Sequence, residues 1–160
     1  MTSPDPTRES RFEQLFAVLG DMDAAVAAVY RDRGEGEVRP RFALPLIRLA
    51  RLGPMTITAL AAEVDRSHSA LSQTIAQMRR AGLVTSEAGQ DGRTRIVSLT
   101  DRGRALVPFA EAEWRATEAA IAEVEAELPY ALSQAAADLA AALERRSFAE
   151  RLADHLNGPE

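Results

Sequence analysis

The sequence predicts a mainly α-helical (α+β) chain with about six helices and one small β-hairpin. Three observations carry this prediction. Apolar residues recur at helical spacing near both ends of the chain, two short helical segments near its centre are joined by a tight turn, and two strand-like runs then flank an Asp-Gly turn. We expect a disordered tail at 1–10, a helical region at 11–40, a compact centre at 41–104 and further helices at 105–160.

The first half begins with two helices. Residues 11–30 carry an apolar stripe at spacings of three and four, made of Phe12, Leu15, Phe16, Leu19, Met22, Val26 and Val29. The glycines and proline of DRGEGEVRP end this helix. A second helix is expected over Phe42 to Leu52, with Pro45 tolerated in its first turn and Gly53-Pro54 as its stop.

Two short helices follow, and each begins with a residue that can cap it. Thr56 precedes the helical run that ends near Val64, and Ser67 precedes SHSALSQTIAQMRRAGL, which ends at Gly82. Asp65-Arg66 leaves room only for a tight turn between them. Such a pair is a helix-turn-helix unit, whose second helix can enter the major groove of DNA.

The second helix of this unit has two distinct faces. Leu71, Ile75 and Met78 share one face and are expected to pack inward. The opposite face carries Ser69, Gln73, Ala76 and Arg80, with Ser72 and Gln77 on its flanks. Serine and glutamine can hydrogen-bond to base edges, and arginine reaches phosphates. Taken alone, however, a polar helix face is also what solvent exposure produces.

A β-hairpin is expected next, with strands at Leu83 to Glu87 and Arg95 to Leu99 around Asp91-Gly92. A helix-turn-helix followed directly by a hairpin is a winged helix. A wing tip beside the recognition helix projects over the minor groove, whose negative potential favours Arg93 and Arg95. Asp91 can pair with Arg93 and orient it. The alternative is that these arginines only keep a turn soluble.

Helices account for the rest of the chain. We expect one from Thr100 to about Leu128-Pro129, with a bend at Pro108, and another from Tyr130 to about Leu156. Alanine dominates both, and a head of this size does not need so much helix for its own core. These helices and the first helix are therefore predicted to bury their apolar stripes in a two-fold homodimer.

Composition narrows the function further. The net charge is −5, but residues 51–104 hold eight arginines and five acidic residues, so a basic centre lies between acidic ends. All 19 basic residues are arginine. A GC-rich genome favours arginine and alanine codons, so this preference for arginine over lysine needs no functional cause. The chain has no cysteine and two distant histidines, so we expect no metal site and no cofactor. No membrane segment, signal peptide, phosphate loop or catalytic motif is evident, which predicts a cytoplasmic protein that is not an enzyme.

The central part of the chain resembles the MarR family of winged-helix transcriptional regulators. The main match is the wing signature D-x-R, an apolar strand and L-T-x-x-G, formed here by Asp91, Arg93, Val97, Leu99, Thr100 and Gly103. Leu60, Ala61, Ser72, Gly82, Leu83 and Val84 support it. The turn departs from the family's Gly-Val-Ser, because Asp65-Arg66-Ser67 stands there, and Arg66 replaces an apolar residue. Asp65 tolerates the left-handed backbone such a turn needs.

The resemblance implies a homodimeric repressor that binds a pseudo-palindromic operator in double-stranded DNA and is released by a small aromatic or anionic effector. The residues expected at the DNA are Ser67, His68, Ser69, Ser72, Gln73, Gln77, Arg80, Arg93 and Arg95, with Asp91 supporting the wing. An effector crevice between the helices and the head could be lined by Phe16, Tyr30, Phe42 and Trp114, which could equally be core or dimer-interface residues. The alternative function is a winged-helix module that binds proteins and recognises no operator.

Overall fold

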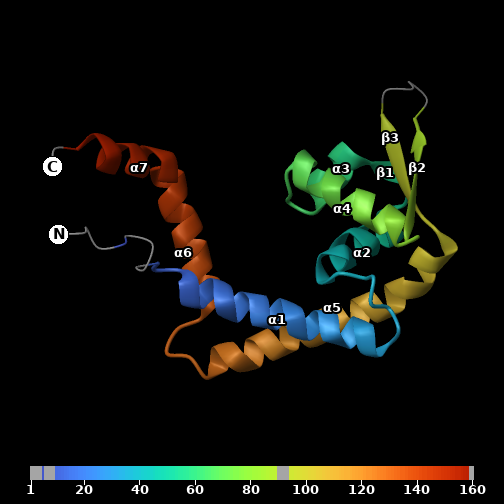
Figure 1. Ribbon diagram of the computed structural model, residues 1–160, viewed down its shortest axis with the longest axis horizontal. Coiled ribbons are helices and arrows are strands. Elements are labelled where there is room, and N and C mark those ends of the chain that lie inside the picture. The colour runs from blue at the N-terminus through green and yellow to red at the C-terminus, as the bar shows by residue number, and fades with distance from the viewer. Residues whose placement is uncertain (1–4, 6–9, 90–93, 159–160) are drawn as a thin grey trace. The chain divides into compact units, whose positions relative to one another are not determined.

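The computed structural model describes residue 5 and residues 10–89 and 94–158 (Figure 1). Most of the expected tail at 1–10 therefore lies outside the described residues. Asp91 and Arg93 at the wing tip lie outside them too. The chain divides into two compact units, residues 1–115 and 116–160. Among the described residues, no helix is long and apolar enough to span a membrane.

Three helical segments open the first unit. Helix α1 spans Glu13–Asp32, the 3-10 turn η2 spans Pro40–Phe42, and α2 spans Ala43–Leu52. The apolar stripe of α1 is mostly exposed within the chain, because only Tyr30 at its end is fully buried. Proline at the first position of η2 supplies the backbone angle that a helical turn requires, so the start expected at Phe42 is extended by one tight turn.

The central helices follow the predicted pattern. Helix α3 spans Ile57–Glu63 and α4 spans His68–Arg80. Thr56 and Ser67 act as N-caps, because their hydroxyls accept hydrogen bonds from the backbone nitrogens of Ala59 and Ala70 at 3.1 and 3.2 Å. Gly82 closes α4 with a positive φ of 68°, as expected for a C-terminal glycine.

The wing belongs to a three-stranded antiparallel sheet rather than to an isolated hairpin. Strands β1 (Met55–Thr56), β2 (Val84–Ala88) and β3 (Arg95–Leu99) are arranged in the order β1-β3-β2. The hairpin was predicted, whereas β1 was not. A strand of two residues shows no alternation that a sequence can reveal, and it exists because β3 offers it a free backbone edge.

The hydrophobic core of the first unit lies where α2, α3, α4, the sheet and the start of α5 (Asp101–Ala126) meet. Its largest fully buried side chains are Tyr30, Phe42, Leu46, Leu60, Met78, Leu83, Val38 and Val97. The inward face predicted for α4 is confirmed, because Leu71, Ile75 and Met78 are each buried in this core. Burial of these three side chains fixes the orientation of the opposite face.

A close contact joins the wing base to helix α5, which spans Asp101–Ala126. Thr100 donates its hydroxyl hydrogen to the Gly82 carbonyl at 2.6 Å and accepts from the Gly103 nitrogen at 3.0 Å. A Cβ at Gly103 would lie 3.1 Å from the Leu83 carbonyl carbon and 3.3 Å from Leu99 Cδ2. The L-T-x-x-G motif therefore has a packing role, because only glycine lets α5 pass so close to the strand.

The second unit holds the end of α5 and two further helices, α6 (Leu132–Arg145) and α7 (Phe148–Asn157). The sequence predicted one helix from Tyr130 to about Leu156, and this is wrong. Arg146 is extended, with φ −154°, and Ser147 and Glu150 form a capping box that starts a new helix. The described residues thus form seven α-helices, where about six were expected.

Candidate nucleic-acid interface

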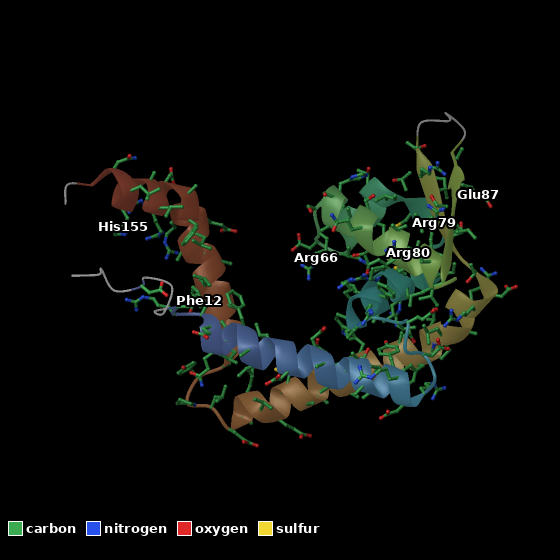
Figure 2. All side chains as sticks on the ribbon, viewed as in Figure 1. Phe12, Arg66, Arg79, Arg80, Glu87 and His155 are labelled. Atoms are coloured by element: carbon green, nitrogen blue, oxygen red, sulfur yellow. The ribbon has the colours of Figure 1, made fainter. Side chains whose placement is uncertain are left out.

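The turn between α3 and α4 sets the direction of α4, the second helix of the helix-turn-helix unit. Asp65 adopts a positive φ of 49°, and the Arg66 nitrogen donates to the Ala61 carbonyl at 3.0 Å. The left-handed residue expected at Asp65 is therefore present. The Arg66 side chain is exposed and donates to the neighbouring Asp65 carbonyl at 3.3 Å. The turn thus forms without an apolar residue at this position and leaves a cation at the surface beside the start of α4 (Figure 2).

Helix α4 presents a polar surface opposite its buried face. His68, Ser69, Gln73, Ala76 and Arg80 are exposed, while Ser72 and Gln77 on the flanks are half-buried. Ser67 is exposed too, but its hydroxyl already accepts the capping hydrogen bond. The predicted residues of α4 therefore share one surface, on which the short side chains lie toward the helix start and the cations at its end.

Arg79 and Arg80 occupy the last turn of α4 (Figure 2). Within the described part of the chain, neither side chain has a hydrogen bond or an ion pair, so both guanidinium groups are available to bind an anion. Both border a hollow against β2, and Arg80 also borders a second hollow on the side of η2. A hollow of about 570 Å³ separates this turn from β2, and its lining consists of Ala76, Arg79, Arg80, Val84, Thr85 and Ser86.

The wing continues this surface beyond β2. Strands β2 and β3 pair from Val84 and Leu99 at the base to Ala88 and Arg95 toward the tip. One further hydrogen bond joins the Gly89 nitrogen to the Thr94 carbonyl at 2.8 Å. Arg95 is exposed at the first position of β3, so it lies near the tip, as expected. Arg93 and Asp91 lie outside the described residues.

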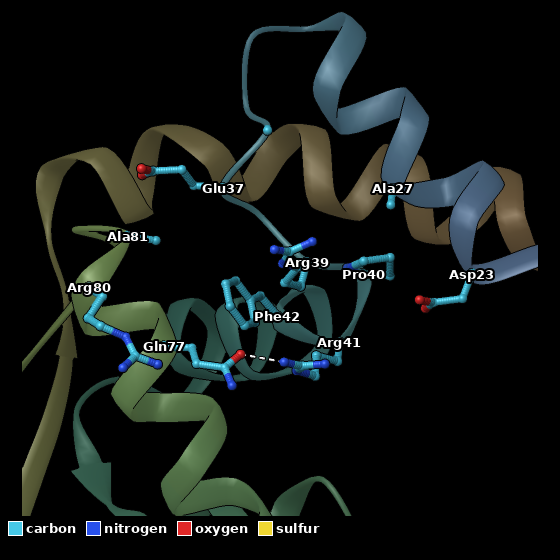
Figure 3. A pocket seen from close by; sticks show the side chains of 11 residues that line it. Asp23, Ala27, Glu37, Arg39, Pro40, Arg41, Phe42, Gln77, Arg80 and Ala81 are labelled. Carbon is cyan, nitrogen blue, oxygen red and sulfur yellow. Dashed lines mark hydrogen bonds between the residues drawn. The ribbon is translucent and has the colours of Figure 1, made fainter. Parts of the chain in front are cut away.

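Sequence reasoning missed a contact on the other flank of α4. Arg41, in the turn η2, donates a short hydrogen bond to the side-chain oxygen of Gln77 (Figure 3). Gln77 was expected to contact DNA, yet here its oxygen holds an arginine from another element. The only signal in the sequence was the R-P-R run at 39–41, whose position beside α4 depends on the tertiary fold.

The four aromatic residues considered for an effector crevice lie in different environments. Tyr30 and Phe42 are core residues with 0% and 1% exposure. Phe16 on α1 is 67% exposed, and Trp114 on α5 is 38% exposed. Trp114 borders two cavities of about 250 Å³, one beside Thr74 of α4 and one between α2 and α5. Phe42 borders a different hollow, near α1 and Arg80.

Tyr30 joins α1 to α5 through a buried polar contact. Its hydroxyl donates to Glu113 at 3.0 Å, and its ring meets Phe109 edge-on at 5.2 Å. Burial, together with the Glu113 carboxylate, raises the pKa of Tyr30 above its usual range. The phenol therefore stays protonated and keeps donating, which suits a structural role.

Comparisons with known proteins agree with this geometry. A family model described as "Rrf2: Iron-dependent Transcriptional regulator" matches residues 42–102. A MarR family transcriptional regulator from Silicibacter pomeroyi is 28% identical, with 85% of this chain and 96% of that chain covered and a TM-score of 0.58. The M. tuberculosis regulator MosR, solved in complex with DNA, is 26% identical, with coverages of 86% and 98% and a TM-score of 0.60.

The S. aureus MepR–DNA complex shares the fold at 16% identity, with coverages of 86% and 98% and a TM-score of 0.62. No relative was found among curated protein sequences. The winged-helix fold and the resemblance to the MarR family are thereby confirmed. The prediction that the chain is not an enzyme is supported as well, because the matched proteins named here are described as regulators or are solved on DNA.

The iron dependence in the matched family description does not fit this chain. Thiolate ligands are excluded because the sequence contains no cysteine. Its two histidines, His68 and His155, lie in different units. The described residues contain no group of three or more His, Cys, Asp or Glu side chains that could hold a metal ion. The match therefore reflects the shared winged helix.

Proposed function

We propose that this chain, a winged-helix protein of the MarR type, is a DNA-binding transcriptional regulator that recognises a specific operator in the cytoplasm. One observation carries the proposal. The apolar face of α4 is fixed in the core by Leu71, Ile75 and Met78. The opposite, polar face ends in Arg79 and Arg80, whose guanidinium groups have no partner among the described residues, and it lies beside a wing that carries Arg95. Two relatives with this fold were solved in complex with DNA.

In this proposal α4 enters the major groove. Ser69 and Gln73 hydrogen-bond to base edges, while Arg80 reaches a guanine edge or a phosphate from the last turn. His68, Ser72 and the Ser67 region lie at the start of the helix, where backbone nitrogens also attract phosphate oxygens. The base contacts provide specificity, and the phosphate contacts set the register.

The wing enters the neighbouring minor groove. Arg95 projects from the start of β3, and Arg93 precedes it by two residues along the chain. A narrow minor groove concentrates negative potential, so arginine gains most from insertion there. Asp91 is assigned the role of orienting Arg93. Together, wing and helix extend the contact beyond the base pairs that one helix can reach.

Two copies are proposed to act together as a homodimer. The stripe of α1 exposes Phe12, Phe16, Leu19 and Val29 to solvent within one chain. The second unit, taken by itself, has no buried residue in α6 or α7, while Leu132, Leu139, Phe148 and Leu156 are exposed. Helices with so much uncovered apolar surface gain stability from a second copy. The two heads would then face a pseudo-palindromic site, about 34 Å apart.

Regulation by a small aromatic or anionic effector completes the proposal. A dimer holds DNA through both heads at once, so a ligand that changes their separation weakens both contacts together. Repression would then end when the ligand binds. Of the four aromatic residues considered, Trp114 borders two cavities and is 38% exposed, so Trp114 is the residue at which ligand contact is proposed.

The test is fluorescence anisotropy with the purified protein, using the intergenic DNA upstream of its own gene and a scrambled duplex at several salt concentrations. We expect the native duplex to bind about a thousandfold more tightly. Gln73→Ala should reduce this ratio by about tenfold, whereas Arg95→Ala should weaken binding. Arg115→Ala, which removes an exposed charge from α5, is the matched control. Equal, weak binding to both duplexes would instead favour the protein-binding module.

The homodimer has a separate test in sedimentation equilibrium. Phe16 is 67% exposed within the chain, so Phe16→Glu should leave the fold intact and convert the dimer to a monomer. Circular dichroism checks that the helices remain. A wild-type chain that sediments as a monomer at micromolar concentration would contradict this part of the proposal.

A further inference from the structure

A cationic hollow lies on the flank of α4 that faces away from the wing (Figure 3). It has a volume of about 570 Å³ and is bounded by α1, the segment 36–42 and the last turns of α4. Three arginines line it: Arg39 and Arg41 from around η2, and Arg80 from α4. None of the residues expected at the DNA from the sequence lies on η2.

The backbone that carries Arg39 and Arg41 is held firmly. Phe42, which is 1% exposed, anchors η2 in the core, and its nitrogen donates to the Arg39 carbonyl at 2.8 Å. Pro40 restricts the backbone between the two arginines. The Arg41 guanidinium also donates to Gln77 of α4. Its position is therefore coupled to the recognition helix itself, and less side-chain entropy is lost when it binds an anion.

The acidic residues at the hollow neutralise only part of the positive charge of its three arginines, so the arginines can bind an anion. Glu37 lies 3.8 Å from Arg102, which also binds Glu35 at 2.7 Å. Asp23 belongs to α1, and Figure 3 shows it at the end of the hollow away from Gln77. Among the described residues, the Arg39 guanidinium has no hydrogen-bond or ion-pair partner; only the Arg39 backbone carbonyl is hydrogen-bonded. Three guanidinium groups therefore meet two carboxylates, one of which is already near a cation.

Helix α4 thus has a cation-bearing hollow on each flank. On the wing side, Arg79 and Arg80 border the hollow against β2, and on the other side Arg39 and Arg41 border the hollow against η2. A helix in the major groove, which is about 12 Å wide, has one sugar-phosphate backbone on each side. With α4 in the major groove, these two backbones would face the two hollows.

We propose that Arg39 and Arg41 bind backbone phosphates on the strand opposite the wing, so that α4 is clamped between cations on both sides. This rests on the proposed function. Gln77 is a positioning residue in this arrangement, because its oxygen orients Arg41 rather than a base. The phosphate contacts made by Arg39 and Arg41 carry no sequence information and set the depth and register of α4.

The experiment measures duplex affinity against salt concentration for Arg39→Ala, Arg41→Ala and the control Arg115→Ala in the full chain. Each of the first two should weaken the native and scrambled duplexes by the same factor, about tenfold at low salt. Each should also lower the slope of log affinity against log salt by about 0.9, the value for one lost phosphate contact. Gln77→Ala should weaken binding less, and adding it to Arg41→Ala should change nothing further.

Three results would overturn the proposal. The variants could retain the slope of Arg115→Ala, or they could change the preference between duplexes, which would make them base contacts. Alternatively, calorimetry could show that the wild-type hollow binds inorganic phosphate while Arg41→Ala leaves duplex affinity unchanged, which would assign it to a free anion. Failure of the proposed function itself looks different, because the wild type would then show no preference between duplexes whatever the salt slope.

Discussion

The contact between α5 and the wing base predicts an unusual response to Gly103→Ala. In the interior of a helix, alanine normally stabilises by about 1 kcal/mol over glycine. At Gly103 the added Cβ would lie 3.1 Å from the Leu83 carbonyl carbon, and the carbonyl oxygen is closer still. Carbon atoms pack best at about 3.5–4.0 Å, and a backbone carbonyl cannot rotate away. Either α5 or β2 must therefore shift.

Such overpacking costs about 3 kcal/mol when the neighbour is backbone, so the net loss should be about 2 kcal/mol. Urea denaturation followed by circular dichroism at fixed protein concentration would measure it, and the melting temperature should fall by roughly 4–8 °C. Ala105→Gly, at an exposed position of the same helix, measures the difference in helix propensity between alanine and glycine by itself. It should lower the free energy of unfolding by about 1 kcal/mol. If Gly103→Ala stabilises the protein as much as Ala105→Gly destabilises it, the steric argument is refuted.

Three other predictions concern stability and pH. Ser67→Ala removes the N-cap of α4 and should cost about 1 kcal/mol in urea denaturation, and an unchanged midpoint would show that the cap is redundant. Tyr30→Phe should cost about 1–3 kcal/mol, because Glu113 loses a buried donor. Because burial raises the pKa of Tyr30 in the folded state, the contribution of Tyr30 to the free energy of unfolding should be complete below about pH 10. It should fall above that pH, where the phenol ionises in the unfolded chain, and Tyr30→Phe should lack this fall. The hydrogen bonds from Ser147 lower the pKa of Glu150, so the ionised carboxylate stabilises the start of α7 near neutral pH and this stabilisation is lost in acid. Helicity measured by circular dichroism against pH should therefore decline less for Glu150→Gln than for the wild type.

The local chemistry of the sequence was sufficient wherever one residue determines one conformation. Thr56 and Ser67 cap helices because their hydroxyls reach a backbone nitrogen three residues on. The inward face of α4 followed from helical spacing alone, since three apolar residues on one side must be buried. The break between α6 and α7 was also readable in principle from S-x-x-E at 147–150, but the surrounding alanine-rich pattern concealed it.

The sequence by itself therefore determined helices α1 to α5, the hairpin, the polar face of α4 and the absence of thiol chemistry, because each depends on neighbouring residues or on composition. Only the tertiary structure decided what distant segments do to one another. It paired β1 with β3, brought Gly103 against Leu83, and placed Arg41 on Gln77 across 36 positions of the chain. These contacts depend on how the core packs, and no local pattern encodes the separation between two segments once they are packed.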